Sequence, residues 1–573
     1  MHLHCWLLRL VAALSLCTCL VQAAAAQSSN DSLAVVPPIG PGTYPVACSN
    51  VAQDFSRLTP GDTPDAYWEG EPGPNGGRYV TSLLADPANA LVVNFNLPDD
   101  KELFGRFAGS QLSYLVLVCY PTGSDNARAD YVLPSGKAVP RMQRGAEAPL
   151  FATDRARYPA VLFSHGLSGS PLSADYLDAV TLLASYGYVV IAPFHGDARI
   201  ADIQLEDLND LAYAILHFSD YTAMQAARPL SLSAALDAVL ANPAFAARID
   251  PAQIGGFGGS LGGESLLLMA GARLTTTIGL SSKQVENDTR LKAAVGYVPY
   301  FGQVILPAFG RDQHGLDGMM LPYLAISGTA DTVAPIAQTA IGMDRLTFTR
   351  ELVALEGVQH GFDRTASPDI FTWSLTFLGG NVQDDPIMRA RSARMTQVAG
   401  GGADMLLLDY VAPLPPNADQ RIAIEYYNAA LNHYFITAEP AEAAMLDAGI
   451  VVPGWRRTGF DFKVHAVDSP NGRSACRFFG TPGIGPSSHF FTIDAAECAK
   501  VKANPFWTYE GLAFNADAPV LEDCPSDRVP VVRLYNNGMG GQANHRFVTS
   551  HSEIRAMLAQ GWIREGAVFC GLP

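Results

Sequence analysis

The sequence is short of positive charge and of metal-binding motifs. Its 573 residues include 38 Lys and Arg against 55 Asp and Glu, so the formal net charge is −17. Nucleic-acid binding needs clustered basic residues to meet the phosphates, and this balance argues against a nucleic-acid partner. The chain also lacks the C-x-x-C and H-E-x-x-H spacings, so no such motif argues for a metal, and we expect neither a metal nor a cofactor.

Long apolar runs are missing too. After residue 26 no stretch is apolar enough to span a bilayer, and we expect no transmembrane segment. Residues 1–26 instead have the parts of a secretory signal peptide: Arg9, an apolar stretch over 10–21, and small residues at 24–26. We therefore predict a secreted or periplasmic protein whose mature chain starts with a flexible segment, 27–43.

Cysteine is scarce, and three of the nine cysteines fall within the predicted signal peptide. The remaining six are an even number, which suits an oxidising compartment. The simplest pairing joins the two N-terminal ones to each other and forms two bridges within the tail, although the sequence itself does not decide it. The six cysteines are Cys48, Cys119, Cys476, Cys498, Cys524 and Cys570.

From Tyr158 onward, apolar runs typical of buried strands alternate with helical patterns. Such a pattern predicts a mostly parallel sheet with helices on both faces, the α/β class. Two β-rich runs, 90–95 and 114–120, come earlier and predict an antiparallel start. The later strands are predicted at 160–164, 188–193, 254–257, 293–298, 323–327 and 352–355, and the helices at 173–186, 207–218, 230–240 and 372–378.

Ser260 lies at the centre of Gly258-Gly259-Ser260-Leu261-Gly262, between a predicted strand and a predicted helix. This G-x-S-x-G pattern is that of a nucleophile elbow, in which small neighbours let a serine occupy a sharp, strained turn. On its own the pattern also fits a Gly-rich corner. The backbone N–H of Leu261, directly after the serine, would be one oxyanion donor.

Asp331 and His360 each follow a predicted strand, and the order Ser, Asp, His is that of an α/β-hydrolase triad. Ser260 would then be the nucleophile, His360 its base, and Asp331 the group that orients the imidazole. A turn-forming Asp and a capping His are the structural alternatives. Glu356 and Asp363 are rival acids that lie very close to His360 in sequence.

Several segments resemble known hydrolases. Residues 157–167, residues 184–190 and the elbow resemble the platelet-activating-factor acetylhydrolase and dienelactone-hydrolase-like group of α/β-hydrolases, and 328–335 looks like the acid loop of cutinase-like polyester hydrolases. The resemblance implies the N–H of Leu167 as the second oxyanion donor. Those families usually carry His before the nucleophile, where this chain has Gly259, which would leave more room beside the serine.

Polar residues near these motifs are assigned to the surroundings of the site. His165 is interpreted as structural, whereas His195 and Asp197, which follow the next strand, are expected to form the pocket wall. Residues 200–228 and 274–287 are read either as cap or rim elements or as plain surface segments.

The tail repeats a pattern three times. His433, His489 and His545 recur every 56 residues, and each is followed by a short helical pattern and then by Trp, Gly and Phe at fixed spacing. Each unit predicts strand, strand, helix, strand, and three units would bury a shared core. A closed pseudo-threefold arrangement, such as a trefoil, is compatible with this pattern. The tail resembles a repeat domain of unknown function from exported bacterial proteins. Its His and Trp residues fit a metal site, a glycan-binding stack or a core, and their regularity favours the core.

Together these patterns predict a secreted serine carboxylic-ester hydrolase acting on a small-molecule or polymeric ester. The α/β-hydrolase domain would span 44–411, a linker 412–421, and a β-rich three-repeat accessory domain 422–573, with a surface polymer or cell wall as its candidate ligand. Three alternatives stay open: a cutinase-type polyester hydrolase, a peptidase or amidase with the same triad, and a non-catalytic polymer-binding protein.

Overall fold

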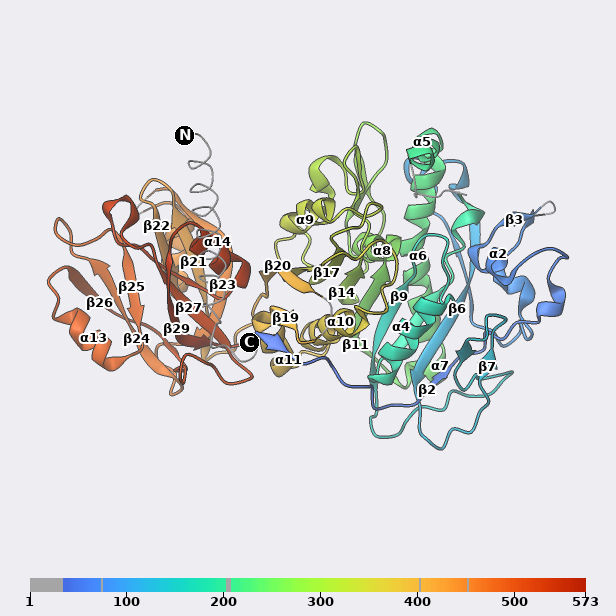
Figure 1. Cartoon of the computed structure of the whole chain (residues 1–573), viewed down its shortest axis with the longest axis horizontal. Helices are drawn as coiled ribbons and strands as arrows, with labels where there is room; N and C mark the ends of the chain where they lie inside the picture. Colours follow the sequence, from blue (N-terminus) through green and yellow to red (C-terminus); the bar gives the residue numbers. More distant parts are fainter. Residues whose placement is uncertain (1–33, 74–75, 202–207, 401–402, 451–452) are drawn as a thin grey trace, which may run out of the picture.

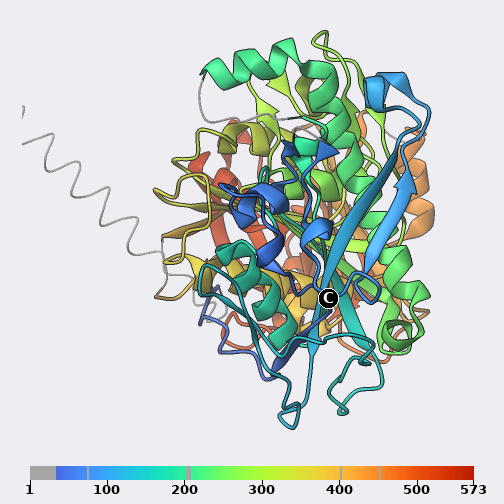
Figure 2. The ribbon, with the colours of Figure 1, turned by 90° about the vertical axis from the view of Figure 1, so that its right-hand side faces the viewer.

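The computed structural model describes residues 34–73, 76–201, 208–400, 403–450 and 453–573. The predicted signal peptide lies outside them. Two parts lie side by side along the long axis (Figure 1), and the view down that axis has the C-terminal part behind the larger one (Figure 2). Within the described ranges, no helix is long and apolar enough to cross a membrane.

A ten-stranded sheet forms the centre of the larger part. Its order is β2-β6-β10-β9-β11-β14-β17-β18-β20, with β5 paired to β6. The strands from β10 to β18 run parallel, while β6 and β20 pair antiparallel with their neighbours. The bounds are β2 (Val46–Cys48), β5 (Val92–Asn96), β6 (Gln111–Pro121), β9 (Tyr158–Ser164), β10 (Val189–Pro193), β11 (Ile249–Gly259), β14 (Leu291–Tyr297), β17 (Tyr323–Gly328), β18 (Arg350–Leu355) and β20 (Asp404–Tyr410).

Helices cover both faces of this sheet. Neighbouring residues of a strand point to opposite faces, and in β11 a side chain at Gly255 would meet α10 (Ser367–Val382), whereas one at Gly256 would meet α8 (Leu261–Met269). The long helix α6 (Phe218–Ala241) packs on α8. The mixed α/β architecture with a large central sheet therefore agrees with the prediction.

The helices before the elbow differ from their prediction. Separate helices are expected over 207–218 and 230–240, but the structure has α5 (Leu208–Leu216) followed by α6, a helix of 24 residues with Pro229 in its interior. Proline removes a backbone donor and usually ends a helix, so the sequence pattern stops there. Burial of much of α6 against the sheet and α8 offsets that cost.

Two short segments form strands that composition does not predict. β20 lies in the Gly/Pro-rich end of the predicted hydrolase domain and adds an antiparallel edge to β18. β1 (Val35–Val36) lies within the predicted flexible segment and pairs in parallel with β19 (Gln397–Val398). Both strands depend on a partner distant in sequence, so no local pattern reveals them.

The order strand, strand, helix, strand recurs three times in the C-terminal part. Equivalent phenylalanines of the three units, among them Phe435, Phe491 and Phe547, are buried in one core. The bounds are β21 (Gln420–Asn428), β22 (His433–Thr437), α12 (Pro440–Asp447) and β23 (Trp455–His465); β24 (Arg473–Gly480), β25 (His489–Thr492), α13 (Ala495–Lys502) and β26 (Trp507–Ala516); β27 (Val529–Tyr535), β28 (His545–Val548), α14 (His551–Ala559) and β29 (Ile563–Gly571).

The repeated histidines lie inside this part. His433 and His545 are buried, and His489 Nδ1 lies 3.0 Å from His433 Nε2. Burial lowers the pKa of both His433 and His545 to about 3, so these imidazoles are neutral at ordinary pH. Nowhere in the described ranges do three or more His, Cys, Asp or Glu side chains form a group that could hold a metal ion.

Ion pairs link each repeat unit to the next in a closed ring. Glu425 in β21 stands where the other two units carry Arg477 and Arg533, so the charge is reversed where the third unit meets the first. The pairs are Arg477 with Glu442 (2.8 Å), Arg533 with Glu497 (3.1 Å) and, at the closure, Arg546 with both Glu553 (2.6 Å) and Glu425 (2.9 Å).

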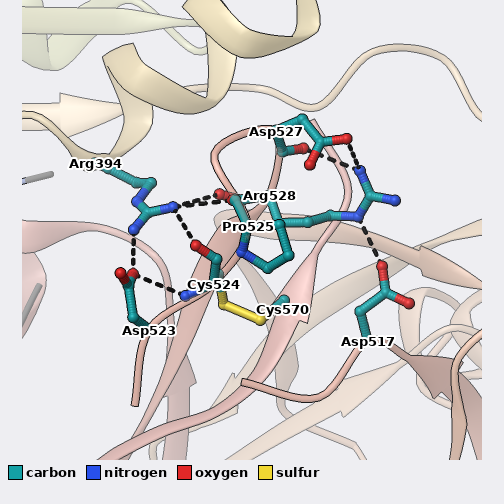
Figure 3. The surroundings of a disulfide bond; sticks show 8 residues. All are labelled: Arg394, Asp517, Asp523, Cys524, Pro525, Asp527, Arg528 and Cys570. Carbon is teal, nitrogen blue, oxygen red and sulfur yellow. Dashed lines mark hydrogen bonds and ion pairs between the residues drawn. A yellow bond between two sulfur atoms is a disulfide. The ribbon is translucent and has the colours of Figure 1, made fainter. Parts of the chain in front are cut away.

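Three disulfides are present, Cys48–Cys119, Cys476–Cys498 and Cys524–Cys570, which is the pairing expected as simplest. The last one supports the contact between the two parts (Figure 3). Arg394, the buried last residue of α11 (Pro386–Arg394), pairs with Asp523 and donates to the carbonyl oxygens of Cys524 (2.9 Å) and Pro525 (3.0 Å).

A second contact between the parts joins β20 to α14. The buried carboxylate of Asp409 accepts hydrogen bonds from the backbone N–H groups of His551 and Ser552, each at 2.8 Å, and from the hydroxyl of Ser550 at 3.0 Å. Negative charge at a helix N-terminus is stabilising, because the first N–H groups of a helix lack intrahelical partners. Asp409 thus supplies an acidic cap to a helix of the other part.

Replacing Asp409 by Ala should lower the free energy of unfolding by about 2 kcal/mol, because three hydrogen bonds to a charged acceptor are lost. Guanidinium unfolding followed by tryptophan fluorescence measures the change. Asp419→Ala removes an exposed carboxylate between the parts and serves as the matched control. Equal midpoints for the two variants would contradict a stabilising role for Asp409.

Candidate active site

Ser260 occupies the sharp turn between β11 and α8. Its φ of 52° and ψ of −121° are strained for a residue with a side chain. The turn is held by backbone hydrogen bonds: the Ser260 N–H donates to Tyr297 O at 2.9 Å, and Ser260 O accepts from the N–H groups of Gly263 and Tyr300. The local geometry is therefore that of the elbow predicted from the sequence.

The glycines around Ser260 are required by close approach. A Cβ at Gly258 would collide with the backbone of Gly262, and a Cβ at Gly262 would collide with the carbonyl oxygen of Ser164 at the end of β9. Helix α8 thus starts in contact with two strand ends. A larger residue at either position would push the helix away from the sheet.

Three predicted site residues lie in one hydrogen-bonded chain. Ser260 Oγ is 3.0 Å from His360 Nε2, and His360 Nδ1 is 2.8 Å from Asp331 Oδ2. With Nδ1–H donating to the carboxylate, Nε2 is the acceptor for the serine proton. A hydroxyl so placed can be activated as a nucleophile.

The surroundings of Asp331 fix this arrangement. Its side chain is fully buried, and its Oδ1 accepts from the backbone N–H groups of Val333 (2.9 Å) and Ala334 (2.8 Å). The other oxygen, Oδ2, is left for His360. The rival acids differ: Glu356 is exposed, and Asp363 Oδ1 accepts from the backbone and hydroxyl of Thr365.

A cavity of about 370 Å³ opens beside Ser260 and His360. Leu167 and Leu261 both line it, together with Tyr176 and Phe362. In the portion of the chain that the structure describes, neither the Leu167 nor the Leu261 backbone N–H donates to a protein acceptor. Two unused donors and one hydroxyl therefore border the same space, where a developing negative charge would be stabilised.

The space beside Gly259 is filled rather than open. A Cβ at Gly259 would lie 3.0 Å from Cε1 of Tyr176 in α4 (Ala174–Ser185), whose hydroxyl accepts from the Gly166 N–H at 2.9 Å. The expectation of extra room beside the serine is therefore wrong. Tyr176 falls within the helix predicted over 173–186, and nothing in the sequence indicates its contact with Gly259.

His195 and Asp197 also differ from their prediction, because they lie beneath the cavity and not in its wall. His195 is buried between the hydroxyls of Ser164 (2.9 Å) and Ser231 (2.8 Å). Asp197 is buried and pairs with Arg228 of α6. The sequence interpretation reads residues 200–228 as cap, rim or plain surface segments and gives Arg228 no role.

His165 is buried as well, in agreement with a structural role. Its Nε2 accepts from the His195 N–H at 3.1 Å, and its Nδ1–H donates to Gly166 O at 2.8 Å. Burial lowers the pKa of His165 to about 4, so the imidazole stays neutral and keeps this tautomer near pH 7.

Glu264, in the first turn of α8, is a buried carboxyl close to the site. Gln225 Nε2 donates to its Oε1 at 2.7 Å. Burial raises the pKa of Glu264 to about 8. The carboxyl is therefore mainly neutral at pH 7, which spares the core beneath Ser260 a buried negative charge.

One comparison with known families bears on the larger part. Residues 139–211 match the family described as platelet-activating factor acetylhydrolase, isoform II. The match includes the turn at His165 and Leu167 but ends before Ser260. It supports a hydrolase-like domain of the lipase or esterase type.

The tail matches a different family. Residues 422–572 match a domain of unknown function, DUF5648, and this range contains all three repeat units. No curated protein matches the chain. The comparisons thus give a class for the larger part and no activity for the tail.

The pH dependence of stability should report the buried Glu264. Its folded pKa of about 8 exceeds the unfolded value of 4.5, so its contribution is complete below pH 4.5 and is lost as the pH rises toward and through 8. In Glu264→Gln this loss disappears, and unfolding across that pH range measures it. Glu356→Gln, which changes an exposed carboxylate, should follow the wild type; parallel curves for all three proteins would refute the assignment.

Proposed function

We propose that this protein is a serine carboxylic-ester hydrolase of the α/β-hydrolase fold. The observation that carries the proposal is the chain from Ser260 to His360 to Asp331, with separations of 3.0 and 2.8 Å, beside a cavity. The partial family match gives independent support for ester-bond hydrolysis. No cofactor is needed for this chemistry.

In the acylation step, Ser260 Oγ attacks the ester carbonyl carbon while its proton passes to His360 Nε2. The carbonyl oxygen becomes an oxyanion, which the N–H groups of Leu167 and Leu261 stabilise. Asp331 stabilises the imidazolium. When the tetrahedral intermediate collapses, the C–O bond to the alcohol breaks, and the leaving oxygen takes the proton from His360.

Water completes the cycle by the same route. His360 accepts a proton from a water molecule as the water oxygen bonds to the acyl carbon. The bond from that carbon to Ser260 Oγ then breaks, and the serine recovers its proton from His360. The products are a carboxylic acid and an alcohol.

The remaining proposals concern location and domain layout. We infer export, because the three disulfides suit an oxidising compartment and residues 1–26 read as a signal peptide. The catalytic domain would end near residue 411 and the accessory domain begin near 422. The family matched by the tail carries no activity that could be transferred to this chain.

Replacing Ser260 by Ala should lower kcat on a soluble p-nitrophenyl ester by about 10⁴-fold or more. The variant lacks the nucleophile, and the residues of a triad act as one unit. A fluorophosphonate probe should label the wild type and fail to label the variant. Ser135→Ala, at an exposed position far from the site in sequence, is the control. Undiminished turnover in Ser260→Ala, or an unlabelled wild type, would reject the proposal.

Asp331→Asn should lower kcat by about 10⁴-fold, since the amide favours the wrong imidazole tautomer and cannot stabilise the imidazolium. Asp363→Asn changes the rival acid near His360 and should leave kcat close to that of the wild type. The same p-nitrophenyl ester assay compares the two. If Asp363→Asn proves the more damaging change, the acid of the triad has been misassigned.

A further inference from the structure

A buried ion pair lies under the turn that follows β9, and the proposed reaction gives it no role. Arg228 of α6 and Asp197 are 1% and 4% exposed, and they meet side by side, Nε to Oδ1 at 2.8 Å and Nη2 to Oδ2 at 2.5 Å. Burying two charges is costly unless their remaining donors and acceptors are also satisfied. The partners of those remaining atoms therefore indicate what the pair does.

Among the described residues, the other side-chain hydrogen bonds of the pair go to one turn. Arg228 Nη1 donates to the carbonyl oxygen of His165 at 2.7 Å, and Nη2 donates to that of Gly166 at 2.9 Å. Asp197 Oδ2 accepts from the N–H of Ser168 at 3.3 Å, and Ser168 has a left-handed φ of 54°. The pair thus bonds to the peptide groups that precede and follow Leu167.

Because a peptide group is planar, the hydrogen bonds to Gly166 O also fix the direction of the Leu167 N–H. In a trans peptide the carbonyl of one residue and the N–H of the next point opposite ways, and the described residues include no cis peptide bond. Gly166 O is bonded on the buried side by Arg228 and by His165 Nδ1–H. The N–H of Leu167 therefore points away from the ion pair, and Leu167 itself borders the cavity beside Ser260.

We propose that Arg228 is a positioning residue that holds the Gly166–Leu167 peptide in the orientation needed for the Leu167 N–H to stabilise the oxyanion. This inference rests on the proposed ester hydrolysis. Gly166 has no Cβ, so the flipped peptide is sterically accessible to it. Without the arginine, the carbonyl oxygen of Gly166 would keep only neutral donors among the described residues, His165 Nδ1–H at 2.8 Å and the N–H of Gly169 at 3.3 Å.

An arginine suits this role better than a lysine. Its planar guanidinium donates in fixed directions to Asp197 and to two carbonyl oxygens at once. A lysine ammonium keeps the charge next to Asp197 but cannot span the same three acceptors. Arg228→Lys is therefore the variant that preserves the positive charge and removes the simultaneous hydrogen bonds to the two carbonyl oxygens.

The test uses the full-length protein, a soluble p-nitrophenyl ester, and a trifluoromethyl ketone that Ser260 converts to a tetrahedral oxyanion. Arg228→Lys should lower kcat by about 10- to 10²-fold with little change in KM, and should weaken the ketone by a similar factor, because loss of one oxyanion donor costs about 10²–10³-fold. The pH profile of kcat/KM should keep its wild-type shape, since His360 is untouched. The double variant Arg228→Met with Asp197→Asn removes both charges, so it leaves no unpaired charge buried. It should show the same losses as Arg228→Lys, and it keeps the test informative if Arg228→Lys does not fold.

The outcomes separate this inference from the proposed function. A wild type without esterase activity rejects the function itself. An active wild type with unchanged kcat in folded Arg228→Lys or in the double variant overturns the positioning role. Turnover that falls only in step with the melting temperature, with ketone affinity retained, also overturns it, since a purely structural role would act that way.

Discussion

The contact between Gly262 and the carbonyl of Ser164 is the constraint on which the rest of the site depends. It allows α8 to begin against the end of β9, directly after Ser260 leaves β11. The two strand ends and the helix start thereby share one small region. The turn after β9 and the turn before α8 then border the same cavity, and the loop after β18 brings His360 to it. Asp331 lies buried at Nδ1 of His360, away from the cavity lining. A methyl group at position 262 would separate these elements.

Local chemistry explains which features the sequence predicts well. Buried strands are apolar runs, and Ser260, Asp331 and His360 each follow such a run, so their placement at strand ends could be read directly. Arg228 and Tyr176 act on residues distant in sequence, and neither has a local signature. The strand β20 is similar, because its hydrogen bonds come from β18 across a helical segment. What depends on tertiary contact alone was therefore missed or wrongly placed.

Directional polar bonds join the two parts of the chain, beside a small apolar cluster of Ala390, Ala393 and Val529. The buried guanidinium of Arg394 donates to the carbonyl oxygens of Cys524 and Pro525 in the tail. Asp409 enters it as an anion at the start of α14. Such directional bonds are strong only at one geometry. The junction consequently fixes the orientation of the tail relative to the sheet more sharply than apolar packing would.

The charge reversal at Glu425 makes the three repeat units non-interchangeable. If the first unit were copied into the second place, its glutamate would face Glu442, and two like charges would meet where Arg477 now forms an ion pair. A fourth unit added after the third would likewise separate Arg546 from Glu425. Duplication of the first unit is thus penalised electrostatically. A single residue whose sign differs from that of its counterparts therefore assigns the first unit to the place where the ring of ion pairs closes.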